Sequence, residues 1–252
     1  MTGNTYRIGQ IVPSSNTTME TEIPAMLRLR EQIRPERFTF HSSRMRMKTV
    51  VKEELAAMDA ESDRCALELS DARVDLLGYA CLVAIMAMGR GYHRKSQERL
   101  QAHTEKNGAK APVITSAGAL VDALAVMKVK RVALVAPYML PLTETVVDYI
   151  RHEGYEVSDW RALQIPDNLE VGRHDTRKLP GIVQGMKTDD VDAIVLSACV
   201  QMPSLAAIAT VEAMTGKPVV TAAVATTYAM LRALDLEPIV PGAGALLSGA
   251  YA

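Results

Sequence analysis

The sequence predicts an α/β protein of two pseudo-symmetric halves, each a parallel sheet flanked by helices, with an active site between them. Two observations predict this fold. Short apolar runs alternate along the chain with longer stretches of helical periodicity, and two segments of the first half recur in the second half. The 252 residues, of which 48% are hydrophobic and 23% charged, suffice for one large or two small globular domains.

Six apolar runs are short enough to be buried strands of parallel sheets, and residues such as Pro, Gly, Asp and Asn bound them. They cover residues 8–12, 74–80, 113–116, 132–136, 191–198 and 219–222. Because consecutive parallel strands need crossover connections, the helical stretches between these runs support the same fold.

The clearest helical pattern places six residues on one face at alternating spacings of four and three. These residues are Val51, Leu55, Met58, Ser62, Cys65 and Leu69. They predict a single amphipathic helix. Further helices are expected over residues 142–151, ended by Gly154, and over residues 204–214, opened by Pro203. A last helix is expected over residues 223–234.

The internal repeat defines the two halves. Residues 7–13 and 131–137 each consist of an arginine, an apolar strand and a proline, and residues 74–81 and 191–199 each run from Val-Asp to Ala-Cys. Generic strand composition is the alternative, but both pairs recur in the same order, which favours related halves. We expect a first half over residues 1–115, a second over residues 116–222, and a segment over residues 223–252 that packs back on the first half.

Composition excludes several classes of protein. A formal net charge of −1 and an aromatic content of 4% argue against nucleic-acid binding, which needs a basic surface and stacking side chains. No run approaches the roughly 18 apolar residues of a membrane helix. Three cysteines are too few for a disulfide scaffold. Since the first residues lack the pattern of a secretory signal, we expect a cytoplasmic protein with free thiols.

Two of the cysteines follow predicted strands. Cys81 and Cys199 lie at the carboxyl ends of the repeated runs, where open α/β sheets bind ligands. Each precedes sequence that can open a helix, and a helix N-terminus lowers the pKa of a thiol. Burial in the core is the alternative for any free cysteine, and Cys65, on the apolar face of a helix, fits that alternative.

Polar side chains follow other strands at the same sheet edge. Ser15 and Asn16 belong to a loop of small donors that can hold a carboxylate, or that simply caps a helix. The Tyr138 phenol can donate a hydrogen bond to a ligand, or it can simply pack in a half-buried position. Asn168 can act as an amide donor, or it can be only a turn residue. The five histidines lack metal-ligand spacing, so no metal site is expected.

Three segments carry a family resemblance that extends from about Tyr6 to the C-terminal helix. Residues 11–20, 78–83 and 196–204 resemble bacterial maleate cis-trans isomerases of the aspartate/glutamate racemase superfamily. The resemblance implies isomerisation of maleate to fumarate through a covalent succinyl-cysteine intermediate, without metal or organic cofactor, in a homodimer.

The resemblance also implies residue roles. Cys81 is then the nucleophile and Cys199 the partner acid or base. The implied substrate-binding groups are the side chains of Asn16, Tyr138 and Asn168, together with Ser15 and backbone N–H groups near Leu82, Val83, Val200 and Gln201. Two other functions remain open from the residues alone. One is a two-cysteine racemase or decarboxylase, which exchanges protons without an adduct, and the other is a non-catalytic module that binds small carboxylates.

Overall fold

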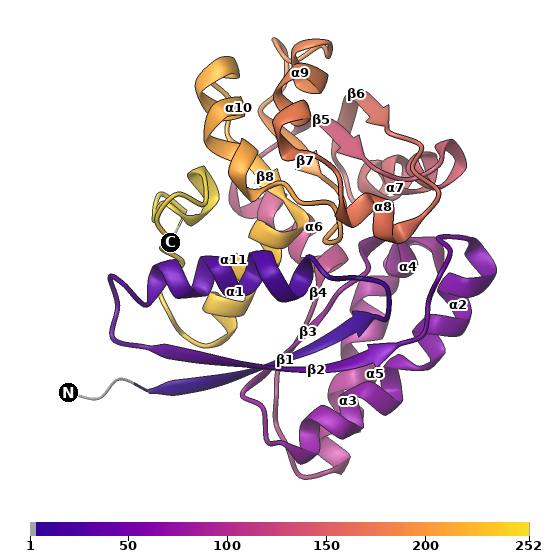
Figure 1. The fold of residues 1–252 in the computed structure, drawn as a ribbon, viewed down its shortest axis with the longest axis vertical. Helices are drawn as coiled ribbons and strands as arrows, with labels where there is room; N and C mark the ends of the chain where they lie inside the picture. The colour runs from indigo at the N-terminus through magenta and orange to yellow at the C-terminus, as the bar shows by residue number, and fades with distance from the viewer. Residues whose placement is uncertain (1–3, 252) are drawn as a thin grey trace.

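The computed structural model describes residues 4–251 and contains two four-stranded parallel sheets, each flanked by helices (Figure 1). The first sheet has the order β2-β1-β3-β4 and the second has the order β6-β5-β7-β8, so the halves repeat one topology. The strands are β1 (Thr5–Pro13), β2 (Arg37–Met45), β3 (Leu76–Tyr79), β4 (Val113–Thr115), β5 (Arg131–Ala136), β6 (Glu156–Ala162), β7 (Ala193–Ser197) and β8 (Val219–Thr221). The predicted α/β fold of two parallel sheets is confirmed.

All six predicted strands are present, and β3 and β7 are shorter than the apolar runs that predicted them. Strands β2 and β6, which lie at one edge of each sheet, were not predicted. Both contain several charged or polar residues and are only partly buried. Edge strands tolerate such composition because one side of the strand is not paired within the sheet.

The helices of the first half begin with α1 (Met19–Arg30) and end with α5 (Tyr92–Lys106). Between them lie α2 (Lys52–Ala60), α3 (Ser62–Asp71) and α4 (Leu82–Ala87). The single helix predicted across residues 51–69 is wrong, because α2 and α3 are separate. The Ser62 hydroxyl donates to the Asp59 carbonyl over 2.6 Å at this break, and such local bonds compete with helix continuation. The predicted buried face nevertheless holds, except at Val51, which precedes α2 and is exposed.

The helices predicted over residues 142–151, 204–214 and 223–234 are present as α7 (Leu140–His152), α10 (Ile208–Thr215) and α11 (Ala222–Ala233). Helices α6 (Ser116–Val126), α8 (Asn168–Gly172) and α9 (Leu179–Gln184) were not predicted. Gly154 follows α7 with a φ of 99°, as expected of a residue that terminates a helix. The helix predicted over residues 204–214 begins with a short 3-10 turn, Leu205–Ala207, and continues as α10.

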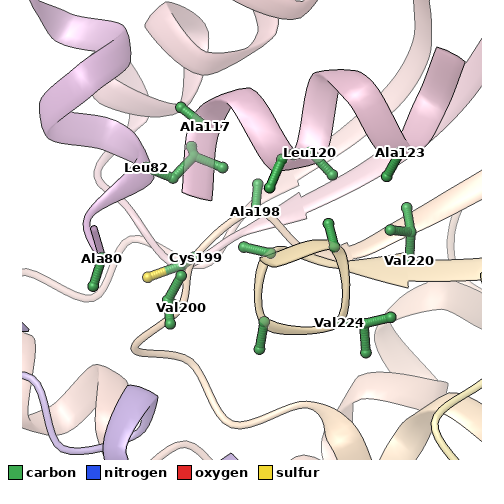
Figure 2. Close-up of a cluster of buried hydrophobic side chains, with 14 of the residues drawn as sticks. Ala80, Leu82, Ala117, Leu120, Ala123, Ala198, Cys199, Val200, Val220 and Val224 are labelled. Carbon is green, nitrogen blue, oxygen red and sulfur yellow. The ribbon is translucent and has the colours of Figure 1, made fainter. Parts of the chain in front are cut away.

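Two equivalent helices join the halves. Thr115 and Thr221 cap α6 and α11, each accepting a backbone N–H over 3.1 Å, and α6 packs against α11 (Figure 2). Helix α11 also packs on α1, β3 and β4. Gly78 of β3 permits this approach, because a Cβ there would overlap Met230 of α11. The division of the chain at residues 115 and 222 stays a prediction.

Within residues 4–251 no helix combines the length and the apolar character that crossing a membrane requires.

Candidate active site

One pocket lies where the carboxyl ends of β1, β3, β5 and β7 meet between the two halves. Its walls are Pro13, Asn16, Met47, Val50, Cys81, Val83, Tyr138, Asn168, Cys199, Val200 and Gln201. The structure therefore brings both strand-end cysteines and three of the predicted polar side chains into one place.

Cys81 occupies a strained turn between β3 and α4. It has φ 87° and ψ 70°, the left-handed region, and it is the N-cap residue of α4. A non-glycine residue in a sparsely populated region costs on the order of 1–3 kcal/mol and persists where the surrounding structure enforces it. The turn places the thiol beside the first N–H groups of α4, as predicted.

Burial raises the pKa of the Cys81 thiol to about 12, against the opposing effect of the Ala84 N–H. The nearby Cys199 and Asp59 raise it further. The start of α4 lowers this pKa through the Ala84 N–H, as expected of a helix N-terminus, but the loss of solvent outweighs that effect. Cys81 is a neutral thiol near pH 7 in this closed pocket.

Cys199 follows β7 and is 6% exposed. Here the predicted equivalence with Cys81 is incomplete, because a loop over residues 200–204 separates it from the next helical turn. The Ser197 hydroxyl donates to the Cys199 carbonyl over 2.8 Å and shapes this loop. Burial raises the pKa of Cys199, while the Tyr138 hydroxyl and backbone N–H groups act against that rise. The sulfur points toward the chain at Ala80 (Figure 2).

Asn16 combines the two roles considered for it. Its Oδ1 accepts the Met19 N–H over 3.0 Å, so the side chain caps the start of α1. The residue is 2% exposed, and no hydrogen bond within residues 4–251 engages its Nδ2. Because the cap fixes Oδ1, the amide nitrogen remains as a donor in the wall of the pocket.

Asn168 and Ser15 form one unit across the two halves. The Asn168 Nδ2 donates to the Ser15 hydroxyl over 2.8 Å, and Asp167 caps α8 so that Asn168 is its first residue. Asn168 lines the pocket, whereas Ser15, a predicted substrate-binding residue, is not among its walls. An amide nitrogen carries two protons, so Asn168 keeps one for a ligand.

Tyr138 lies at the end of β5, as Asn16 lies at the end of β1. Its hydroxyl donates to the Ala198 carbonyl over 3.0 Å. Burial raises the pKa of this phenol well above its usual value, and the two neighbouring thiols raise it further. It is therefore a neutral donor close to both sulfurs.

Of the four residues predicted to bind substrate through backbone N–H groups, three line the pocket and one has its side chain in the core. Val83, Val200 and Gln201 line the pocket. The side chain of Leu82 is buried and points toward Ala117 of α6 (Figure 2), so only its backbone belongs near the site.

Met47 and Val50 line the pocket and were not predicted. They lie between β2 and α2, and they were missed because β2 itself was missed. The alternation of Phe38 and Phe40 with polar residues was the available signal of a strand. Thr49, in the same segment, forms an antiparallel bridge with Asp167, and the residue that follows each of them, Val50 or Asn168, lines the pocket.

The walls of the pocket, as the described residues form them, contain no charged side chain. An anionic ligand is therefore met there by neutral hydrogen-bond donors rather than by Arg or Lys. Within residues 4–251 no three His, Cys, Asp or Glu side chains are grouped so as to hold a metal ion.

Comparison with known proteins places the chain in a family. Residues 8–247 match the Amdase family, arylmalonate decarboxylase. A maleate isomerase of Pseudomonas putida is 80% identical over 246 residues, or 98% of each chain. A crystal structure of a cysteine-to-alanine variant of the maleate isomerase Iso from Pseudomonas putida, with maleate, has a TM-score of 0.97 and 71% identity, and covers 98% of both chains.

A second structure bears on the chemistry. A cysteine-to-serine mutant of the Nocardia farcinica maleate cis-trans isomerase contains a covalently bound succinylcysteine intermediate. Its TM-score is 0.93 at 48% identity, and the alignment covers 96% of this chain and 98% of that one. The chain belongs to the maleate isomerases within the arylmalonate decarboxylase family.

Proposed function

We propose that the protein isomerises maleate to fumarate through a succinyl adduct on Cys81, with Cys199 as acid and base and without a cofactor. The observation that carries this proposal is the pairing of two thiols, from equivalent strand ends, in one pocket with neutral walls. Thiols both add to activated alkenes and leave again, which suits a reaction that must be reversed within one turnover.

Maleate is a dianion, and in this proposal neutral donors hold its two carboxylates. The donors are Asn16 Nδ2, the second amide proton of Asn168, the Tyr138 hydroxyl and backbone N–H groups near Leu82, Val83, Val200 and Gln201. Removing a carboxylate from water is costly unless hydrogen bonds replace the lost hydration, and several converging donors meet that requirement. Fixed dipoles also stabilise the negative charge that grows on one carboxylate during thiolate addition.

The proposed reaction adds the Cys81 thiol to maleate, allows rotation and then eliminates the same thiol. Cys81 loses its proton to water, and the thiolate forms a C–S bond to one alkene carbon. The π electrons move onto the neighbouring carbon and its carboxylate, and Cys199 protonates that carbon. The former double bond is now single, so it rotates. Cys199 then removes a proton from the same carbon, the C–S bond breaks, and fumarate leaves.

One contrast supports Cys81 as the nucleophile. Cys81 directly precedes α4, whose Ala84 N–H stabilises a thiolate at this position, whereas a loop over residues 200–204 follows Cys199. The succinylcysteine of the Nocardia farcinica relative supports the covalent route.

Incubating the purified protein with maleate in a buffer without added metal or cofactor tests the function. We expect fumarate to form in stoichiometric excess over enzyme, followed by its trans-alkene proton signal. Proton exchange into a chiral substrate without fumarate would instead indicate a racemase. Tight maleate binding that survives alkylation of the thiols, with no turnover, would indicate a binding module.

We also propose a homodimer in the cytoplasm. A reducing compartment keeps the three free cysteines as thiols. Met88, Met139 and Leu140 are exposed near the packed helices α4 and α7, and they offer apolar surface for self-association. Light scattering should give a mass twice the 27.4 kDa of one chain. A mass of one chain at all concentrations would contradict the dimer.

A further inference from the structure

Two side chains make reciprocal hydrogen bonds between α1 and the loop that follows Cys199. The Gln201 Oε1 accepts the N–H groups of Thr17 and Thr18 over 2.9 and 3.2 Å. In return, the Glu22 Oε1 accepts the N–H groups of Ser204 and Leu205 over 2.6 and 2.7 Å. Each half of the protein thus caps a turn that begins in the other half.

The Gln201 amide has no capacity left for a substrate. Its Nε2 donates to the Ser15 and Asn168 carbonyls over 3.1 and 2.8 Å, in addition to the two bonds that its oxygen accepts. The side chain therefore ties together the Asn16 loop, helix α8 and the Cys199 loop. Gly172 accommodates it, since a Cβ at that position would lie 2.5 Å from the Gln201 Nε2.

The Glu22 carboxylate is buried in the same contact between α1 and the loop that follows Cys199. Burial raises its pKa, and its bonds to Ser204 and Leu205 act against that rise. Its second oxygen is buried without a hydrogen-bond partner in the described chain. Burying this carboxylate lowers the stability of the fold, because hydrogen bonds replace the lost hydration on one oxygen only. A buried group with such a cost calls for a role in the protein.

We infer that Glu22 and Gln201 are positioning residues that hold Cys199 at its working distance from the carboxylate donors Asn16 and Asn168. We name the four bonds to backbone N–H groups the clasp. The inference rests on the proposed function, because it assigns the clasp to the proton-transfer step of Cys199. Neither side chain is required to touch the substrate.

The clasp has a kinetic signature. A shift of about 1 Å in a reacting group costs on the order of 100-fold in rate. Loosening the Glu22 bonds leaves the donors of the Asn16 loop in place and displaces the Cys199 loop. The expected result is a fall in kcat that exceeds any rise in KM, because the displaced loop carries Cys199 as well as the Val200 and Gln201 N–H donors. A merely structural role instead lowers the melting temperature and leaves kcat per folded enzyme unchanged.

The test compares Glu22→Ala, Glu22→Gln and the control Glu170→Ala with the unsubstituted protein. Glu170 lies on α8 and forms a surface ion pair with Arg173. We expect Glu22→Ala to lower kcat by about 10- to 100-fold. Glu22→Gln retains a side-chain acceptor and should restore most of that loss, and Glu170→Ala should match the unsubstituted protein.

Combining Glu22→Ala with Cys199→Ser shows whether the substitution acts through Cys199. In Cys199→Ser, Glu22→Ala should lower the rate of succinyl-adduct formation on Cys81 far less than it lowers kcat when Cys199 is present, because the clasp acts mainly through Cys199. If Glu22→Ala proves unstable, Gly172→Ala displaces the Gln201 amide without removing a hydrogen-bonding group, and it should show the same fall in kcat.

Three outcomes would overturn the inference: an unchanged kcat in Glu22→Ala, or, if that variant is unstable, in Gly172→Ala; no recovery in Glu22→Gln; or an adduct rate that falls equally in the Cys199→Ser background. Failure of the proposed function gives a different result, since the unsubstituted protein would then form no fumarate at all.

Discussion

The Tyr138 hydroxyl donates a hydrogen bond of 3.0 Å to the carbonyl of Ala198, the residue that precedes Cys199. This bond joins the end of β5 to the end of β7 and holds the phenol beside both thiols. The same group thus fixes the Cys199 segment in the closed pocket. Because a phenol has one proton, the proposed donation to a substrate carboxylate requires the bond to Ala198 to break when substrate enters.

Tyr138→Phe should therefore affect both activity and stability. Loss of one donor to developing charge lowers kcat by about 100-fold or more. The Ala198 carbonyl is left without its partner, which costs about 1–3 kcal/mol of unfolding free energy. Steady-state kinetics and urea denaturation measure the two effects, and unchanged kcat would remove Tyr138 from the proposed mechanism.

The pKa of Cys81 predicts an alkaline activity profile. Because burial raises that pKa to about 12, the reactive thiolate is a small fraction of the free enzyme at pH 7. At pH values below the pKa, each increase of one pH unit raises the thiolate fraction about tenfold. We therefore expect kcat/KM to rise about tenfold per pH unit between roughly pH 7 and 9. A flat profile over this range would mean that the nucleophile is already ionised.

Asn16→Asp separates the two functions of the Asn16 amide. The aspartate still accepts the Met19 N–H and should preserve the cap on α1, so the melting temperature should not fall. Its second oxygen replaces the free donor with a negative charge that faces the substrate. We expect kcat/KM to fall by at least about 10- to 100-fold, the value of one charge-assisted hydrogen bond of roughly 1.5–3 kcal/mol. Retained activity would contradict a carboxylate site at Asn16.

Asp59 is a structural acid beneath the nucleophile. It accepts the hydroxyls of Tyr79 and Tyr92 over 2.8 and 2.6 Å and an N–H of Arg99 over 3.1 Å. Asp59→Ala should lower the unfolding free energy by more than about 2 kcal/mol, because buried partners lose their acceptor. Asp63→Ala, which removes a more exposed carboxylate near the same arginine, should cost less than about 1 kcal/mol.

Asp59 also contributes to the raised pKa of Cys81. Removing its charge lowers that pKa, so the alkaline rise in kcat/KM should move to lower pH in Asp59→Ala. A profile that does not move would show that the carboxylate has no electrostatic effect on the nucleophile.

The sequence predicts the central strands of both halves and the thiols that follow them, because buried parallel strands are apolar runs with sharp ends. It does not reveal β2 and β6, whose polar composition reflects their edge positions. Met47 and Val50 were not predicted as pocket residues, because the strand that precedes them, β2, was not predicted. Local sequence indicates the helix N-terminus that lowers the pKa of Cys81, but it does not reveal the burial that outweighs this effect.

The Gln201 amide shows a second limit. Its partners Thr17 and Thr18 are 184 and 183 residues away in the chain. The segment around Gln201 was recognisable as part of a site, and the prediction assigned it a backbone contact with substrate. Only the three-dimensional arrangement shows that its side chain joins the two halves.

The most direct test of the account is mass spectrometry of Cys199→Ser after incubation with maleate. We predict a mass increase of roughly 116 Da, one maleic acid added to a thiol, and peptide mapping should place it on Cys81. Cys65→Ala, which removes a buried thiol outside the pocket, should not change this result in the same background. An adduct on Cys65, or substantial isomerase activity in Cys81→Ser, would contradict the central claim that Cys81 is the nucleophile.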